Sequence, residues 1–412
     1  MGNRRYRISK KSLLEIICAV YLFCMIYQSG SVPAALQLDN SLVPITRAGL
    51  LIIPIFCFRN IHDIKKLQYV IFFGLIGLAI NWCVYPEGVV SLSYKFILLI
   101  FFFVAISYFE RKKINVNHIL YLDIIAIIYL TFIFYIIIEV LKFGIPYVYV
   151  RGEGTYWYRS YVGLFFSYHN GLFPRLSGLF WEPGMYAIIL NIALFLYIFK
   201  ENSKKKSELF IILVSIVFCQ SAAGYCIGAL LIIIYIYRNI KTDRNSKYSI
   251  AFISALFSVA IITFIIIQKR NTNINNQAAY SYGLRVSDIV NGIKVFSTSP
   301  LWGVGYGNTD PFSKLDLFGR GSSNGLVSWL YMTGIIGTLY ILIPFINNII
   351  KCPKGKQRNV RLFWLFIVLV FNMSEPIYSL PLMTYILACE LKYRLSRKEV
   401  IGVANGIIEK YS

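Results

Sequence analysis

The chain has 412 residues, of which 57% are hydrophobic and 15% charged, and its formal net charge is +22. Apolar runs of about 15 to 25 residues recur from end to end, which is typical of helices that cross a bilayer. Such a charge in a soluble protein would suggest nucleic acid, but basic loops between membrane helices explain it, so we exclude that partner. The sequence predicts an all-α polytopic membrane protein, a single integral domain over 1–412.

We expect about twelve membrane-spanning helices. The predicted spans are 13–27, 42–58, 68–85, 94–109, 119–143, 174–199, 209–220, 222–237, 248–267, 325–350, 362–372 and 380–391. Most of the 41 Lys and Arg residues fall in the loops that this order places inside, with both termini cytoplasmic. Ser31-Val-Pro-Ala-Ala35 faintly resembles a signal-peptidase site, but we expect the first span to be retained.

Two long loops, 144–173 and 268–324, lie outside in this topology, and we expect a helix over 284–296 in the second. A Gly/Ser break at Ser221–Gly224 separates two short apolar arms, which suggests broken or re-entrant helices that line a cavity.

The predicted span 174–199 carries two charged residues near its outer end. The i,i+7 spacing of Arg175 and Glu182 would place both on one helix face, with Gly178 leaving room between them. Pro183 should kink the helix beside the carboxylate. A carboxylate at that depth costs at least ~2.5 kcal/mol and usually faces a polar cavity with a partner. A substrate site is favoured, and a structural ion pair between helices remains open.

Arginine and aromatic side chains gather in the two outer loops. Arginine suits phosphate because its planar fork donates hydrogen bonds in pairs, and aromatic rings can stack on sugars. A solvated loop surface and the aromatic belt of the membrane interface are the open alternatives. Together the two features favour a lipid-linked phosphate that carries sugars. The candidate arginines are Arg151, Arg159, Arg175, Arg285 and Arg320.

A glycine-rich segment, Ser299–Asn308, lies in the second loop. It lacks a nucleotide-binding motif, and we expect a tight turn whose backbone N–H groups could bind an anion or a sugar hydroxyl. Tyr306 and Asn308 are candidate substrate contacts, as is Asn324 at the start of the span 325–350. The histidines and cysteines show no metal-ligand spacing, so we expect neither a metal nor a cofactor.

Three motifs resemble those of the bacterial O-antigen polymerases of the Wzy type. The first is Arg-x-x-Gly-x-x-x-Glu-Pro from Arg175 to Pro183, and the second is Arg285 upstream of Pro300–Asn308. The third is Ser323-Asn324 ahead of a Gly-x-x-Gly span. The topology resembles this family over the whole chain, the motifs only between about 150 and 340.

This resemblance implies a metal-independent, GT-C-like glycosyltransferase in the bacterial inner (plasma) membrane. It would bind membrane lipid, namely undecaprenyl-diphosphate-linked oligosaccharide, and transfer the growing chain to an incoming repeat on the outer leaflet. The product would be O-antigen or a related surface polysaccharide, and a chain-length regulator protein would be a further partner. O-antigen ligases of the same superfamily carry a histidine in the second outer loop. Loop 268–324 has none, which favours the polymerase but leaves the general base unassigned.

For this reaction the leading catalytic candidates are Arg175 and Arg285, which would stabilise the departing diphosphate. Arg151, Arg159 and Arg320 are reserves for substrate binding. Glu182 would either accept the proton of the acceptor hydroxyl or orient Arg175, and Glu375 is a lesser candidate for both roles. A ligase, and a transporter or flippase of lipid-linked oligosaccharide, are the alternative functions.

Overall fold

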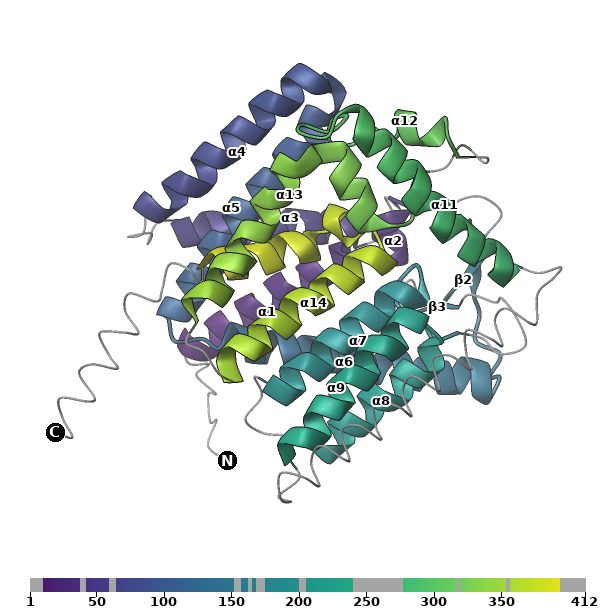
Figure 1. The fold of residues 1–412 in the computed structure, drawn as a ribbon. Helices are drawn as coiled ribbons and strands as arrows, with labels where there is room; N and C mark the ends of the chain where they lie inside the picture. The colour runs from purple at the N-terminus through teal and green to yellow at the C-terminus, as the bar shows by residue number, and fades with distance from the viewer. Residues whose placement is uncertain are drawn as a thin grey trace. The chain divides into compact units, whose positions relative to one another are not determined.

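The computed structural model describes residues 10–37, 42–58, 64–151, 157–161, 165–167, 175–199, 205–239, 277–316, 319, 321–352 and 356–392. The fold is mostly helical (Figure 1). The chain divides into two compact units, and each unit combines two separate segments. Unit 1 contains Met1–Arg47 and Asn115–Leu284, and unit 2 contains Ala48–Ile114 and Arg285–Ser412.

Within the described ranges, four helices are long and apolar enough to cross a membrane: Lys11–Gln28, Pro86–Arg111, Val116–Val140 and Gly325–Lys351. Shorter apolar helices lie at Val43–Phe58, Val70–Val84, Pro183–Phe199 and Ala222–Arg238. Helices also occupy the other predicted spans within the described ranges, and the span expected at 248–267 lies outside them. These apolar helices are consistent with a membrane protein, while the number of about twelve spans remains a prediction.

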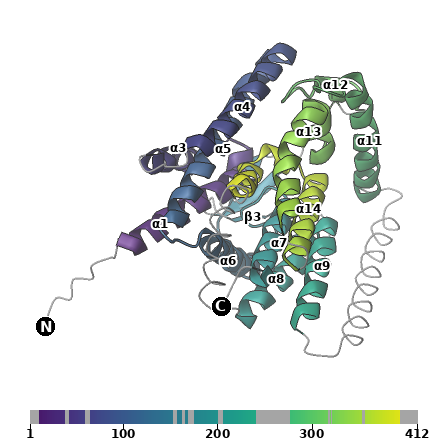
Figure 2. The ribbon, with the colours of Figure 1, turned by 60° about the vertical axis from the view of Figure 1, so that its left-hand side comes forward.

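Unit 1 is built around one buried helix, α7 (Pro183–Phe199), which packs against α6 (Val116–Tyr135), α8 (Lys206–Cys219) and α9 (Ala222–Asn239). Figures 1 and 2 show these four helices side by side. Asn191 in α7 is fully buried, and its Nδ2 donates to Ala187 O at 2.8 Å and to Gly224 O of α9 at 3.2 Å. Helices α1 (Lys10–Gln28) and α2 (Val32–Ala35) also belong to the unit, and α6 continues into a π-helical turn at Ile136–Val140.

The first outer loop contains a small sheet, so the expectation of an all-α fold is wrong here. Strands β1 (Val148–Arg151), β2 (Trp157–Tyr161) and β3 (Phe165–Ser167) form an antiparallel sheet in this order. The register pairs Tyr149 with Arg159 and Arg159 with Ser167. The strands are rich in Val, Tyr, Phe and Trp, the side chains that favour a pleated surface.

Unit 2 contains α4 (Ile64–Val84), α5 (Val89–Arg111), α12 (Asp310–Ser313), α13 (Gly325–Lys351), α14 (Lys356–Ser374), a helix over 381–392 and most of α11 (Gln277–Thr298). Helix α3 (Val43–Phe58) begins in unit 1 and ends in unit 2. The helix predicted at 284–296 is confirmed within α11. Helix α13 is broken at Gly334, whose φ is 64° and ψ −168°.

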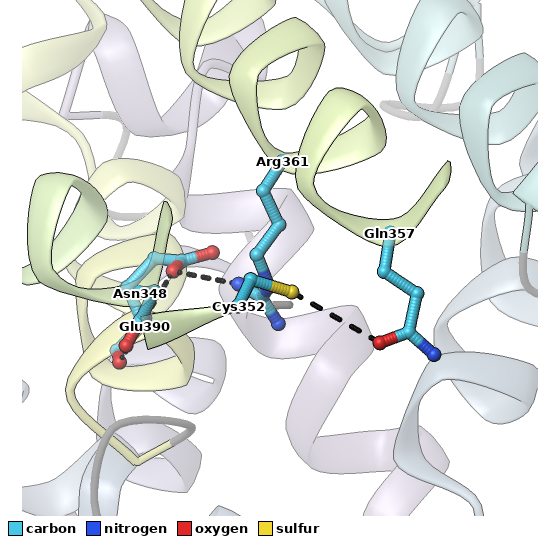
Figure 3. A network of polar contacts seen from close by, with 5 residues as sticks. All are labelled: Asn348, Cys352, Gln357, Arg361 and Glu390. Atoms are coloured by element: carbon cyan, nitrogen blue, oxygen red, sulfur yellow. Dashed lines mark hydrogen bonds and ion pairs between the residues drawn. The ribbon is translucent and has the colours of Figure 1, made fainter. Parts of the chain in front are cut away.

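A buried polar network joins α13, α14 and the helix over 381–392 (Figure 3). Glu390 Oε2 accepts from Asn348 Nδ2 at 2.5 Å and from Arg361 Nη1 at 3.2 Å. Removing one partner of such a pair is costly because the other charge stays buried. The network therefore fixes these helices at the end of unit 2 that the sequence places inside.

The proposed sidedness is tested by cysteine labelling. In a background with the exposed Cys83 replaced by Ser, Thr155→Cys and Asp310→Cys should both react with an impermeant maleimide once the outer membrane is permeabilised. Gln357→Cys, in the predicted inner loop, is the matched control and should react only after the inner membrane is lysed. The topology is wrong if Thr155→Cys or Asp310→Cys needs lysis, because basic loops are expected to stay inside.

Candidate functional site

The Arg175–Glu182 segment does not form the helix that we expected. Helix α7 begins at Pro183, and the preceding residues are irregular. A residue before proline disfavours the helical conformation, whereas proline itself suits the first helical position. Arg175 and Glu182 therefore share no helix face, Pro183 starts the helix instead of kinking it, and Glu182 is exposed at the helix start.

Backbone hydrogen bonds fix this irregular segment to its neighbours in unit 1. Leu176 N donates to Phe218 O of α8 at 3.0 Å, and Trp181 N donates to Gly30 O at 3.1 Å. Leu179 O accepts from Val32 N at 3.0 Å. These contacts replace the intrahelical ladder and satisfy the backbone groups locally.

Arg175 binds the C-terminal end of α8 and not Glu182. Its Nη2 donates to Gln220 O at 2.9 Å, and its Nε lies 3.4 Å from Cys219 O. Gln220 ends the helix in a left-handed conformation with φ 52°. Carbonyls at a helix end lack intrahelical partners, and a cation there also complements the helix dipole. Within the described part of the chain, Arg175 and Glu182 form no ion pair with each other.

We expected Gly178 to leave room for a substrate. In the structure Thr131 of α6 occupies the space beside it. A Cβ at Gly178 would lie 2.2 Å from Thr131 Cγ2, and the φ of Gly178 is +58°. The position therefore requires glycine both for its backbone conformation and for close packing.

We expect Gly178→Ala to destabilise the purified protein by roughly 1–3 kcal/mol, because strain and overlap add at this position. The measurement is the thermal unfolding midpoint in detergent. Gly144→Ala is the matched control, since a Cβ there meets nothing within 4 Å. Equal midpoints for the two variants would contradict this packing.

Arg159 lies among tyrosine side chains on the sheet of unit 1. Its guanidinium is 5.0 Å from the centre of the Tyr147 ring, and the Tyr147 and Tyr161 ring centres are 5.6 Å apart. The pKa of Tyr149 is lowered mainly by its hydrogen bond with Tyr147 and to a smaller extent by its hydrogen bond with Arg159. A cation beside exposed rings can bind both a phosphate and a sugar. The side chain of Arg151 and all of Arg320 lie outside the described residues.

Arg285 lies on α11 in unit 2, where its exposed side chain donates from Nη1 to Ser374 O at 3.1 Å. Ser374 is the last residue of α14, so both predicted catalytic arginines bind the end of a helix. One turn further along α11, the fully buried Asp288 accepts from Ser323 N at 2.8 Å and Ser323 Oγ at 2.5 Å. Asp288 was not predicted, although its i,i+3 spacing from Arg285 was a visible signal.

Asn324 caps helix α13. Its Oδ1 accepts from Val327 N at 3.1 Å, which satisfies one of the open N–H groups at the helix start. A Cβ at the following Gly325 would lie 2.7 Å from Glu375 O, so this helix start packs closely against the buried Glu375. The side chain of Asn324 has a structural role here, and its part in substrate binding remains a prediction.

Contrary to our expectation, several N–H groups of the glycine-rich segment bond within the protein and are not available to a ligand. Val304 N donates to Tyr331 O at 2.9 Å, Gly305 N to Met332 O at 3.0 Å, and Tyr306 N to the buried Asn81 Oδ1 at 2.6 Å. In return Pro300 O accepts from Ile335 N at 2.9 Å. The segment thus pairs with the break in α13.

Two substrate candidates of this segment face the protein. Tyr306 is 4% exposed, and Asn308 Nδ2 donates to Val304 O at 3.0 Å, which closes the turn. The Tyr306 ring packs against Trp329 and Tyr378, with ring centres 5.8 and 6.5 Å apart. Tyr306 therefore belongs to an aromatic cluster with Trp329 and Tyr378.

Comparison with models of known protein families gives no match for this chain, and no curated protein matches it either. The resemblance to O-antigen polymerases therefore rests on the motifs and the predicted topology.

Proposed function

We propose that this protein is a membrane glycosyltransferase that polymerises undecaprenyl-diphosphate-linked oligosaccharide repeats on the outer leaflet of the bacterial inner membrane. The growing chain leaves its lipid carrier and joins the incoming repeat. The product is O-antigen or a related surface polysaccharide.

The supporting observation is that two motifs of the resemblance meet in unit 2, together with a buried carboxylate. Asp288, one turn from Arg285, holds Ser323, the first residue of the third motif. The Pro300–Asn308 segment of the second motif pairs with the break in α13, the helix that follows the third. The Arg285 guanidinium, which is exposed and bound to Ser374 O of α14, lies one turn from this contact and can bind an anionic substrate.

In the proposed reaction, a hydroxyl oxygen of the incoming repeat bonds to the anomeric carbon of the growing chain. The bond from that carbon to the diphosphate oxygen breaks, its electron pair stays on the undecaprenyl diphosphate, and the hydroxyl proton passes to a base. Arg285, with Arg175 as second candidate, stabilises the negative charge that develops on the diphosphate. Glu182 is the candidate base because its exposed carboxylate is accessible to substrate.

The sheet in the first outer loop offers a place for the sugars. Arg159 and its tyrosine neighbours combine a cation with apolar ring faces and hydroxyl edges. Rings of this kind stack on sugars and hydrogen-bond at their edges.

The test uses the purified full-length protein with synthetic lipid-linked repeats and no nucleotide sugar. We expect a ladder of products that lengthens by one repeat at a time, in EDTA as well as in buffer. Absence of polymer under conditions in which the protein stays folded would contradict the proposal. In cells, deletion should leave lipopolysaccharide with a single repeat, whereas loss of every repeat would indicate a ligase or a flippase.

A further inference from the structure

Unit 2 contains a cavity of about 880 Å³ that the sequence analysis did not anticipate. We name it the Lys95 cavity. It is lined by α4, α5, α13, the turn at Trp302–Tyr306 and the helix over 381–392. Along α4 it runs from Val70 to Val84, which corresponds to about 20 Å of helix, or two thirds of the hydrocarbon thickness.

Most of the lining is apolar, and part of it is exposed. Ile76, Ile336, Leu339 and Ile343 are 40–45% exposed although they line the cavity. In a membrane such side chains face hydrocarbon, so a lipid chain is a suitable occupant of this space.

The cationic side chain of Lys95 belongs to this largely apolar lining. Lys95 lies on α5, about 9 Å from the helix start at Val89, at the end that the topology places outside. Its Nζ is 5.3 Å from the centre of the Tyr306 ring and 5.9 Å from that of Tyr378, and it donates to Tyr378 O at 3.4 Å. Among the described residues, no carboxylate forms an ion pair with Lys95.

The contacts of Lys95 leave its charge only partly compensated. The attraction of a cation to an aromatic face is weaker than the cost of holding an ammonium group away from water. Burial raises the pKa of Tyr378 to about 12 and that of Tyr306 well above its usual value, so both phenols keep their protons. A cation beside two protonated phenols suits an anion, and the surrounding apolar walls suit a hydrocarbon chain.

We propose that the Lys95 cavity binds a polyprenyl phosphate or diphosphate, with the phosphate group at Lys95 and the hydrocarbon chain along α4 and α13. The choice of a polyprenyl chain over another lipid rests on the proposed function. The site would hold the carrier lipid of one of the two substrates on the outer leaflet, in the same unit as Arg285.

The test measures equilibrium binding of undecaprenyl phosphate to the full-length protein in phosphatidylcholine nanodiscs. Lys95→Met should weaken binding at least about tenfold and remove the preference for undecaprenyl phosphate over undecaprenol. Lys112→Met, an exposed lysine at the end of the same helix, is the matched control and should bind as wild type does. Lys95→Met should fold, because it removes a charge from an apolar site.

A second variant tests the space independently of the charge. A Cβ at Gly77 would meet nothing within 4 Å, and Gly77 lines the cavity, so Gly77→Phe should fill it without a clash. This variant should weaken binding of undecaprenyl phosphate and undecaprenol alike.

Three results would overturn the inference: no binding by the wild type, wild-type affinity in Lys95→Met, or equal competition by phosphatidylglycerol or inorganic phosphate. Polymer formation by the wild type is scored separately. Polymer with unchanged binding in Lys95→Met refutes the cavity alone, whereas Lys95-dependent binding without polymer refutes only the proposed function.

Discussion

Arg285→Lys should lower the rate of polymerisation about 100-fold although it keeps the positive charge. In the structure the guanidinium donates from Nη1 to Ser374 O, and its other donors remain on an exposed side chain. A planar fork can hold the α14 carbonyl and a diphosphate oxygen at the same time, whereas an ammonium is a point charge on a flexible stem. The measurement is the initial rate with synthetic lipid-linked repeats at matched protein levels.

Arg358→Lys, at the start of α14, is the matched control and should keep its activity. The thermal midpoint is also compared, because Arg285 binds the end of α14 and unfolding of the variant would also lower the rate. A folded Arg285→Lys variant with wild-type rates would remove Arg285 from the site.

Hydrophobic runs alone predicted most of the described helices in both units, although the helix expected at 174–199 begins only at Pro183. A span such as 94–109 needs only its own composition to become helical, because every backbone group in lipid must bond within the segment. The sheet in the first loop carried a weaker signal, since strands of three to five residues depend on their partners for hydrogen bonds.

The site was harder to predict because its contacts join segments distant in sequence. The spacing of Arg175 and Glu182 was meaningful only if one helix contained both. Helix α7 begins at Pro183, so both residues precede it. The acceptors of Arg175 lie at Cys219 and Gln220, and no local pattern reveals them. The Lys95 cavity exists only through the packing of α4, α5 and α13, which no local sequence pattern reveals.

Glu182→Gln should lower turnover about 100-fold or more if Glu182 is the general base, while lipid-linked substrate still binds. Gln keeps the size of the side chain but cannot accept a proton at neutral pH. The structure sharpens this test, because Glu182 is exposed and forms no ion pair with Arg175. Its removal therefore leaves no buried charge without a partner, and Glu182→Ala should fold as Glu182→Gln does.

The remaining structural role for Glu182 is a negative charge at the start of α7, which stabilises a helix by about 0.3–1 kcal/mol. If that is its only role, both variants should keep nearly full turnover and show slightly lower thermal midpoints. If Glu182 is the base, both should lose turnover equally, at unchanged substrate affinity and nearly unchanged stability. Glu182→Asp then tests whether the carboxylate itself is needed. It keeps the carboxylate on a shorter side chain, so its rate should exceed that of Glu182→Gln but stay below that of the wild type. Full activity in Glu182→Gln would exclude proton transfer to Glu182 and leave catalysis to the arginines.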